Sequence, residues 1–207
     1  MKTCVSLLSS ALLLAMTSSA FAASSVDLTV KGLITPSACA PSLSSGGVID
    51  HGKVAAKDLK PDHWTLLGNH TLQLAINCDA PTLVALKGID NQGDAYASMY
   101  GLGLVSGKKL GGYLLTLDNP MADGAATSVI ESPDNGVTWR EMYSDEVWVS
   151  EHLASFGDRA TGSWAPSPVQ QVTTDLLVQT LIAPTAGMDL TAEVPFSGSA
   201  TIEVKYL

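Results

Sequence analysis

The sequence is poor in arginine, in charged residues and in cysteine, and each scarcity excludes a class of function. Only two arginines, Arg140 and Arg159, stand in a chain of 207 residues that has a net charge of −9. An acidic chain with so few arginines lacks the basic surface with which proteins bind nucleic acid. After residue 22, no stretch is long and apolar enough to span a bilayer. We therefore expect neither a nucleic-acid partner nor a transmembrane span.

Motifs of the common catalytic and metal-binding classes are also missing. The four histidines, at positions 51, 63, 70 and 152, form no H-E-x-x-H or other paired spacing. The serines include no G-x-S-x-G, the motif of a hydrolase nucleophile. The loop Asp90–Asp94 has oxygen ligands but not the spacing of an EF-hand. We expect no enzymatic activity, no metal ion and no cofactor.

The N-terminus has the pattern of a secretory signal peptide. Lys2 supplies a positive charge, residues 5–16 are mostly apolar, and Ala20–Ala22 provides small residues at a cleavage site. Cleavage after Ala22 removes residues 1–22, and it takes the net charge from −9 to −10 because Lys2 leaves with them. The remaining residues, 23–207, have the length of one domain.

Two of the three cysteines remain after this cleavage, Cys39 and Cys78. An even number of cysteines in a secreted chain favours a disulfide. The closed loop of about 40 residues corresponds to roughly 4 kcal/mol of stabilisation in the chain-entropy description. A zinc site is the alternative, but the chain has no C-x-x-C and no histidine pair near these cysteines.

Hydrophobic residues alternate with polar ones in several short segments, which is typical of strands with one buried face. The clearest case is Thr71–Cys78, where Leu72, Leu74, Ile76 and Cys78 share one face. Other segments also predict strands: residues 26–34, 48–54, 83–89, 110–117, 127–130, 137–143, 175–182 and 198–207. Residues 57–69 are predicted as a loop, and the pattern over 146–153 fits a strand or a helix. Many short strands between Gly and Pro turns predict one all-β sandwich domain.

The last strand ends the chain and shows the alternation most regularly. Ala200, Ile202, Val204 and Tyr206 alternate with Thr201, Glu203 and Lys205. A chain terminus normally frays unless a sheet holds it. This strand is therefore predicted to be structural and to form one wall of a binding groove.

The order of these motifs resembles the first third of chaperone–usher pilins. The resemblance rests on Val30–Ile34 before Cys39, on Val48–Gly52, on Leu74–Cys78, and on the penultimate aromatic Tyr206. In those subunits a glycine stands seven residues before the first cysteine, and the second cysteine ends a strand about 40 residues later. Residues 101–113 and 182–185 more closely resemble a family of uncharacterised, fimbria-associated periplasmic proteins of proteobacteria.

The resemblance implies an immunoglobulin-like sandwich of pilin type, which lacks its last strand. The groove left open would be lined by Ala200, Ile202, Val204 and Tyr206, and strand addition would complete it. The implied partners are a periplasmic fimbrial chaperone, an usher and sibling subunits, in the periplasm or a surface fimbrium of a Gram-negative bacterium.

The N-terminal segment Val26, Leu28 and Val30 is the candidate donor strand, but it is short. Only sixteen residues, Ala23–Ala38, precede Cys39, whereas five alternating donor positions need roughly ten residues in addition to the first strand of the body. Val194 also stands where such subunits carry a glycine. Residues 26–30 are therefore either a donor strand or an internal strand of a self-contained periplasmic ligand-binding protein.

Ser132, Asp134, Gly136 and Trp139 fit the pattern S-x-D-x-G-x-T-W, the Asp-box of sialidase-type propellers, where it is structural. Asp and Ser side chains bond backbone groups of the turn, and Gly supplies a positive φ. Because the chain has one copy and no 40–50-residue repeat, we interpret it as a hairpin staple.

Trp64 and Trp164 lie in predicted loops, where an aromatic surface stacks on sugars in adhesins. They are the candidate contacts for a host or surface glycan, and a glycan-binding minor adhesin is a further alternative. Packing within the protein is the competing interpretation of both side chains.

Overall fold

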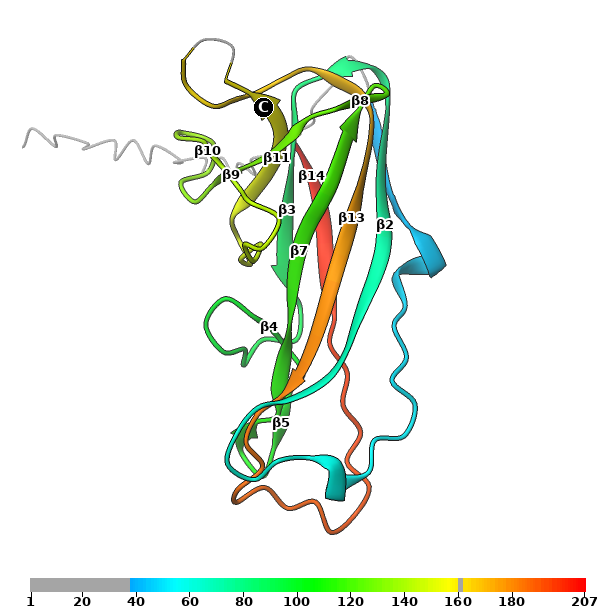
Figure 1. The fold of residues 1–207 in the computed structure, drawn as a ribbon, viewed down its shortest axis with the longest axis vertical. Helices are drawn as coiled ribbons and strands as arrows, with labels where there is room; N and C mark the ends of the chain where they lie inside the picture. The colour runs from blue at the N-terminus through cyan, green and yellow to red at the C-terminus, as the bar shows by residue number, and fades with distance from the viewer. Residues whose placement is uncertain (1–37, 160–161) are drawn as a thin grey trace, which may run out of the picture. The chain divides into compact units, whose positions relative to one another are not determined.

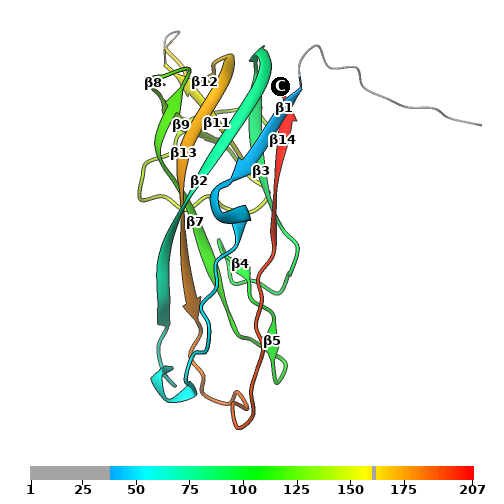
Figure 2. The ribbon, with the colours of Figure 1, turned by 90° about the vertical axis from the view of Figure 1, so that its right-hand side faces the viewer.

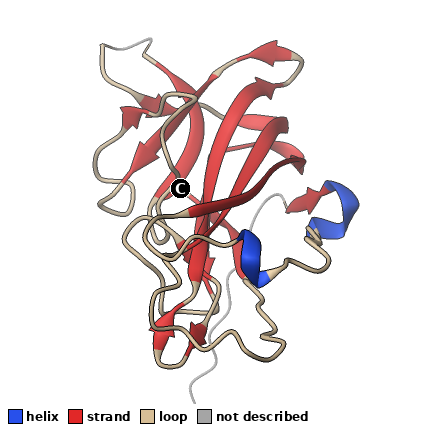
Figure 3. Ribbon diagram, turned by 60° about the horizontal axis from the view of Figure 1, so that its bottom comes forward, coloured by secondary structure: helices blue, strands red, loops and turns tan. Residues whose placement is uncertain are grey.

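The structure is a computed structural model that describes residues 38–159 and 162–207. Strands and loops make up almost all of it, with two short 3-10 turns (Figure 3). The strands form antiparallel sheets, so the chain is all-β, as predicted. Within the two described ranges, no helix has the length and apolar character needed to cross a membrane. The predicted signal peptide, residues 1–22, and the candidate donor segment, residues 26–30, lie outside the described residues.

The first sheet has the strand order β1-β2-β13-β7-β4, and β8 pairs with β7 (Figure 1). These strands are β1 (Cys39–Leu43), β2 (Thr65–Thr82), β13 (Val169–Ile182), β7 (Gly111–Ala122), β4 (Tyr100–Gly101) and β8 (Ala125–Ala126). The alternation predicted for β2 is present, since its inward residues are buried and their neighbours are more exposed. β2 and β13 pair along almost their whole length and form the centre of the sheet.

The second sheet has the order β10-β9-β11-β3-β14, and β12 pairs with β11. Its strands are β10 (Arg140–Glu141), β9 (Ser128–Ser132), β11 (Leu153–Asp158), β3 (Val84–Asp90), β14 (Ala200–Tyr206) and β12 (Ala165–Pro166). The smaller elements are a hairpin of β5 (Leu104–Val105) and β6 (Lys108–Lys109) and the 3-10 turns η1 (Ser44–Gly47) and η2 (Ala56–Asp58). β14 is thus an edge strand of the second sheet.

One hydrophobic core joins the inner faces of the two sheets. Leu74 and Ile76 of β2 and Leu117 of β7 belong to the same buried cluster as Leu86 of β3 and Phe156 of β11. Each such side chain contributes roughly 1.5–3 kcal/mol when it leaves water. A second cluster, around Leu102, Leu110 and Ile182, continues the apolar interior at the other end of β13.

The predicted disulfide is present and ties an edge strand to the first sheet. Cys39 of β1 lies directly opposite Cys78 of β2 in the strand register, and their sulfur atoms are bonded. β1 has only five residues, so this covalent link is a large part of what holds it on β2.

Four expectations about local structure differ from the structure. Of the predicted strand at 137–143 only Arg140–Glu141 is strand, and the segment 146–153, expected as strand or helix, forms turns and loop until β11 begins at Leu153. The other two differences concern strand pairing. Residues 48–54 form no strand, although their inward residues are apolar, because no neighbouring strand pairs with them. The predicted loop at 57–69 is partly strand, because β2 begins at Thr65 and pairs there with Ile182. At residues 48–54 and 57–69, pairing with a neighbouring strand therefore decides whether a strand forms, and the local sequence pattern does not.

Candidate functional site

A large apolar cavity lies along the side of the two sheets where β1 and β14 run. Its volume is about 1120 Å³. Leu72 of β2, Leu115 of β7 and Leu176 of β13 form part of its floor, and residues 43–56 and 190–202 supply its two walls. Small-molecule sites usually enclose roughly 300–1,000 Å³. The cavity is therefore large enough for an extended piece of polypeptide.

The wall on the β14 side starts at a free sheet edge. β14 pairs with β3 on one side, where the Asn91 N–H donates to the Ser199 carbonyl at 2.9 Å. Backbone groups point alternately to the two sides of a strand. The N–H and C=O groups of Ala200, Ile202 and Val204 therefore point away from β3. Among the described residues, no strand pairs with β14 on that side.

The wall on the other side starts at β1, the edge strand of the first sheet, which lies beside β14 (Figure 2). The Asp79 N–H donates to the Ala38 carbonyl, so Cys39 and Pro41 turn their backbone groups toward β14. The Cys39 N–H donates to the Tyr206 hydroxyl at 3.0 Å. Pro41 has no N–H. This part of β1 therefore has no N–H free for another strand.

Below β1 and β14, in the orientation of Figure 2, the walls are two segments without strand pairing, residues 48–55 and 190–199. Ile49 in the first segment, and Val194 and Phe196 in the second, are half-buried against the two core clusters. The apolar side chains thus face the interior, while no sheet pairing engages the backbone of residues 48–55 or 190–198.

Two contacts connect these segments across the mouth of the cavity. The Lys53 ammonium lies 3.1 Å from the Glu193 carboxylate, but both side chains are over nine-tenths exposed, so water screens the ion pair. The His51 and Phe196 rings lie 6.3 Å apart, measured between ring centroids. Neither contact involves the backbone. An entering strand could displace both.

His51 also contacts a second histidine, which its sequence position does not suggest. The His51 and His70 rings lie 5.1 Å apart, edge to face. Partial burial lowers the pKa of His51 below its usual value, and the neighbouring His70 lowers it further, against the opposing charge of Asp50. Over residues 38–159 and 162–207, no three His, Cys, Asp or Glu side chains come together as metal ligands.

The four residues predicted to form a groove wall have three different environments. Ala200 and Ile202 line the cavity. Val204 packs against the main core. Tyr206 is 39% exposed and reaches across to Cys39 of β1. Only the first half of β14 therefore borders the open cavity.

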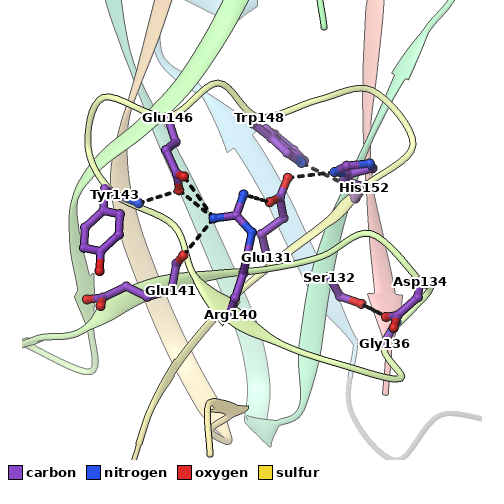
Figure 4. A network of polar contacts seen from close by, with 10 residues as sticks. All are labelled: Glu131, Ser132, Asp134, Gly136, Arg140, Glu141, Tyr143, Glu146, Trp148 and His152. Atoms are coloured by element: carbon purple, nitrogen blue, oxygen red, sulfur yellow. Dashed lines mark hydrogen bonds and ion pairs between the residues drawn. The ribbon is translucent and has the colours of Figure 1, made fainter.

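The hairpin between β9 and β10 is held by hydrogen bonds within its own loop (Figure 4). The Ser132 hydroxyl donates to Asp134 at 2.7 Å, and the Gly136 N–H donates to Ser132 at 2.7 Å. Gly136 has a φ of +92°, and its carbonyl accepts from the Trp139 indole N–H. The hydroxyl and N–H of Thr138, followed by Ser132, lower the pKa of Asp134 to about 2. The motif acts within the loop and does not face the cavity.

Beside this hairpin lies a charged cluster that the sequence does not reveal (Figure 4). The Glu131 side chain is only 2% exposed, and its oxygens contact the Arg140 guanidinium and the His152 ring, the latter at 2.8 Å. Arg140 also contacts Glu146 at 2.8 Å, and this hydrogen bond raises the pKa of Arg140. Each charge has an opposite neighbour, as in a structural ion-pair cluster.

The two candidate glycan contacts do not form one platform. Trp64 directly precedes Thr65, the first residue of β2. Trp164 lies five residues before Val169, and Val169 pairs with Thr82, the last residue of β2. A strand of 18 residues spans roughly 50 Å, so the two rings lie near opposite ends of the sheet. Trp64 packs edge-on against Tyr96, with ring centroids 4.8 Å apart.

Comparison with known proteins relates the chain to a family of unknown function and to two proteins of Escherichia coli. A family described as "Protein of unknown function (DUF1120)" matches residues 28–113. The chain is 26% identical to Protein GltF of Escherichia coli (strain K12), over 91% of this chain and 92% of GltF. It is 33% identical to the uncharacterized protein YhcF of the same organism, over 46% of this chain and 42% of YhcF.

The sequence was expected to resemble a family of uncharacterised, fimbria-associated proteins of proteobacteria. These similarities agree with that expectation as far as it concerns uncharacterised proteins of proteobacteria. None of the matching descriptions names a chaperone, an usher or a fimbria. The pilin-like interpretation therefore depends on the geometry of the cavity.

Proposed function

We propose that the protein is a secreted, non-enzymatic subunit of fimbrial type, which accepts a β-strand into the apolar cavity beside the first half of β14. The observation that supports this most directly is that free edges of two different sheets border one apolar cavity. Exposed strand edges favour pairing with another chain. An added strand supplies main-chain hydrogen bonds to both walls, and its alternate side chains cover the apolar floor.

The occupant we propose is the N-terminal segment of a sibling subunit. In this chain, Val26, Leu28 and Val30 alternate with Asp27 and Thr29, the pattern that a strand over an apolar floor requires. A periplasmic chaperone would cover the same edge before the sibling arrives, and an usher would order the assembly. An immunoglobulin-like sandwich without its last strand has this arrangement.

The disulfide supports a periplasmic or cell-surface location. Cys39–Cys78 is a structural bond of the kind that forms and persists in oxidising compartments. The signal-peptide pattern of residues 1–22 supports the same route.

A peptide-binding experiment tests the proposal. A synthetic peptide of residues 24–34 is titrated into residues 23–207, and binding is measured by calorimetry. We expect saturable binding that Ile202→Asp weakens at least tenfold, because a carboxylate would then stand in the apolar wall of the cavity. The control is Val137→Asp in the exposed hairpin loop. Equal affinities of the two variants would contradict the proposal.

A self-contained site for an apolar small molecule is the alternative, favoured by the size of the cavity. Hydrogen exchange separates the two. A bound strand would protect the amides of Ala200 and Ile202, because it bonds to the β14 edge. A small molecule on the floor would leave those amides unchanged.

A further inference from the structure

We infer that Tyr206 closes the upper end of the cavity, and so limits the site to a strand shorter than the full β1–β14 edge. Here the upper end is the one at which β1 begins and β14 ends, as Figure 2 is oriented. The inference rests on the proposed function, because it specifies which strand the same site can accept.

The spacing of the two edges shows that the upper end is closed. Neighbouring strands lie about 4.8 Å apart, so a strand inserted between β1 and β14 needs them roughly 9.6 Å apart. Cα atoms of β1 and β14 already lie within 8 Å of one another. A strand therefore cannot enter between them unless they separate.

Tyr206 is the side chain that bridges the two edges. Its hydroxyl accepts the hydrogen bond from the Cys39 N–H at 3.0 Å. Both ends of this bridge are anchored: Cys39 is disulfide-bonded to β2, and beyond Tyr206 the Leu207 N–H donates to the Leu83 carbonyl. The bridge therefore connects the first sheet to the second at the end of the groove.

At positions 39 and 41 of β1, whose backbone groups turn away from β2, no main-chain donor is free. The Cys39 N–H is used by Tyr206, and Pro41 has none. The Tyr206 bridge and the proline at position 41 thus make the upper end unsuitable for strand addition.

What remains open begins at Ile202 and continues along residues 48–55 and 190–199. Ala200 and Ile202 both line the cavity and turn their N–H groups away from β3. A shortened acceptor suits a short donor. The three apolar positions at Val26, Leu28 and Val30 match it better than they would match a groove that ran the whole length of β14.

Hydrogen exchange with peptides of two lengths tests the inference. The probes are the peptide of residues 24–34 and the same peptide lengthened by Thr-Val at each end. The affinities of the wild-type protein for the two peptides should agree within about twofold. Both peptides should slow amide exchange at Ala200 and Ile202, and neither should slow it at Val204. Tyr206→Ala should bind the longer peptide about tenfold more tightly, with protection extending to Val204.

The control variant is Tyr143→Ala, which removes an exposed tyrosine from the other end of the second sheet. It should behave as wild type. If Tyr206→Ala does not fold, Tyr206→Phe serves instead, because it removes only the hydroxyl acceptor. Tyr206→Phe should bind the longer peptide about threefold more tightly than the wild type does.

The outcomes separate the two ideas. Added protection at Val204 in the wild type, or the same dependence on peptide length in wild type and variant, overturns the role of Tyr206 and leaves strand acceptance intact. If neither peptide binds any of the proteins, both the proposed function and this inference fail.

Discussion

At the scale of single residues, Glu131 of β9 is the charged side chain that the described residues bury. Its carboxylate is 2% exposed and contacts Arg140 and His152. Glu131→Gln removes the negative charge between them and should lower the free energy of unfolding by about 2 kcal/mol, since a buried partner is lost while Arg140 stays half exposed. Urea denaturation measures this.

The matched control is Glu141→Gln, on the paired strand β10 and more exposed than Glu131. It should change stability by less than about 0.5 kcal/mol. Equal effects of the two substitutions would show that the cluster does not stabilise the fold.

Asp134 gives the hairpin a dependence on pH. Hydrogen bonds from Thr138 and Ser132 lower the pKa of this carboxyl from 3.8 to about 2. A lowered folded-state pKa means that the stabilisation is complete above pH 4, and is lost as the pH falls from about 4 through 2. Trp139 fluorescence should therefore report opening of the loop between pH 4 and 2.

Asp134→Asn should remove this acid transition, because an amide does not titrate. Asp145→Asn, at an exposed position between β10 and β11, should leave it in place. A transition that persists in Asp134→Asn would assign it to another carboxyl group.

At the scale of elements, the disulfide decides whether β1 exists as a strand. The bonded cysteines are 39 residues apart, which corresponds to about 4 kcal/mol of stabilisation in the chain-entropy description. The free energy of unfolding of the double variant Cys39→Ser, Cys78→Ser should therefore be lower by about 4 kcal/mol, as measured by urea denaturation. Reductant should destabilise the wild type equally and leave the variant unaffected.

The two wall segments should respond to mild acid through His51. Burial lowers its pKa below 6.5, with His70 as a further cause and Asp50 opposing, so the neutral ring is favoured in the folded state. The resulting stability is complete above pH 6.5 and is lost as the pH falls through the lowered pKa. Amides of residues 48–54 should exchange faster at pH 5 than intrinsic rates predict. His51→Gln should abolish this extra increase, whereas His63→Gln, at an exposed ring, should not.

The elements that the sequence predicted correctly are those whose own residues carry the pattern. Leu72–Cys78 alternates and lies in β2, and the terminal alternation lies in β14. β1 was missed because Pro41 and the following serines indicate a loop, yet an edge strand tolerates a proline whose missing N–H faces away from its partner.

The parts of the site that could not be predicted depend on contacts between distant residues. Cys39 and Tyr206 are 167 positions apart, and nothing local indicates that a hydroxyl at one bonds the backbone of the other. Glu131 and His152 are 21 positions apart in different strands and loops. For residues 48–54 the sequence predicts a strand that does not form. Their pattern is that of a strand, but no strand of the described residues pairs with them.

At the scale of the whole molecule, the open cavity lies where the two sheets meet, so its occupant would stabilise both. A ligand that binds only the folded state adds RT ln(1 + [L]/Kd), about 2.7 kcal/mol at 100 times Kd. The peptide of residues 24–34 at that concentration should raise the free energy of unfolding by this amount. Because β1 belongs to the first sheet and β14 to the second, slower exchange should extend to amides of β2 as well as β3. Ile202→Asp, which weakens binding at least tenfold, should reduce the increase to about 1.4 kcal/mol or less at the same peptide concentration. Protection confined to β3 and β14 would mean that the peptide adds to one edge only, and that the two sheets are not bridged by it.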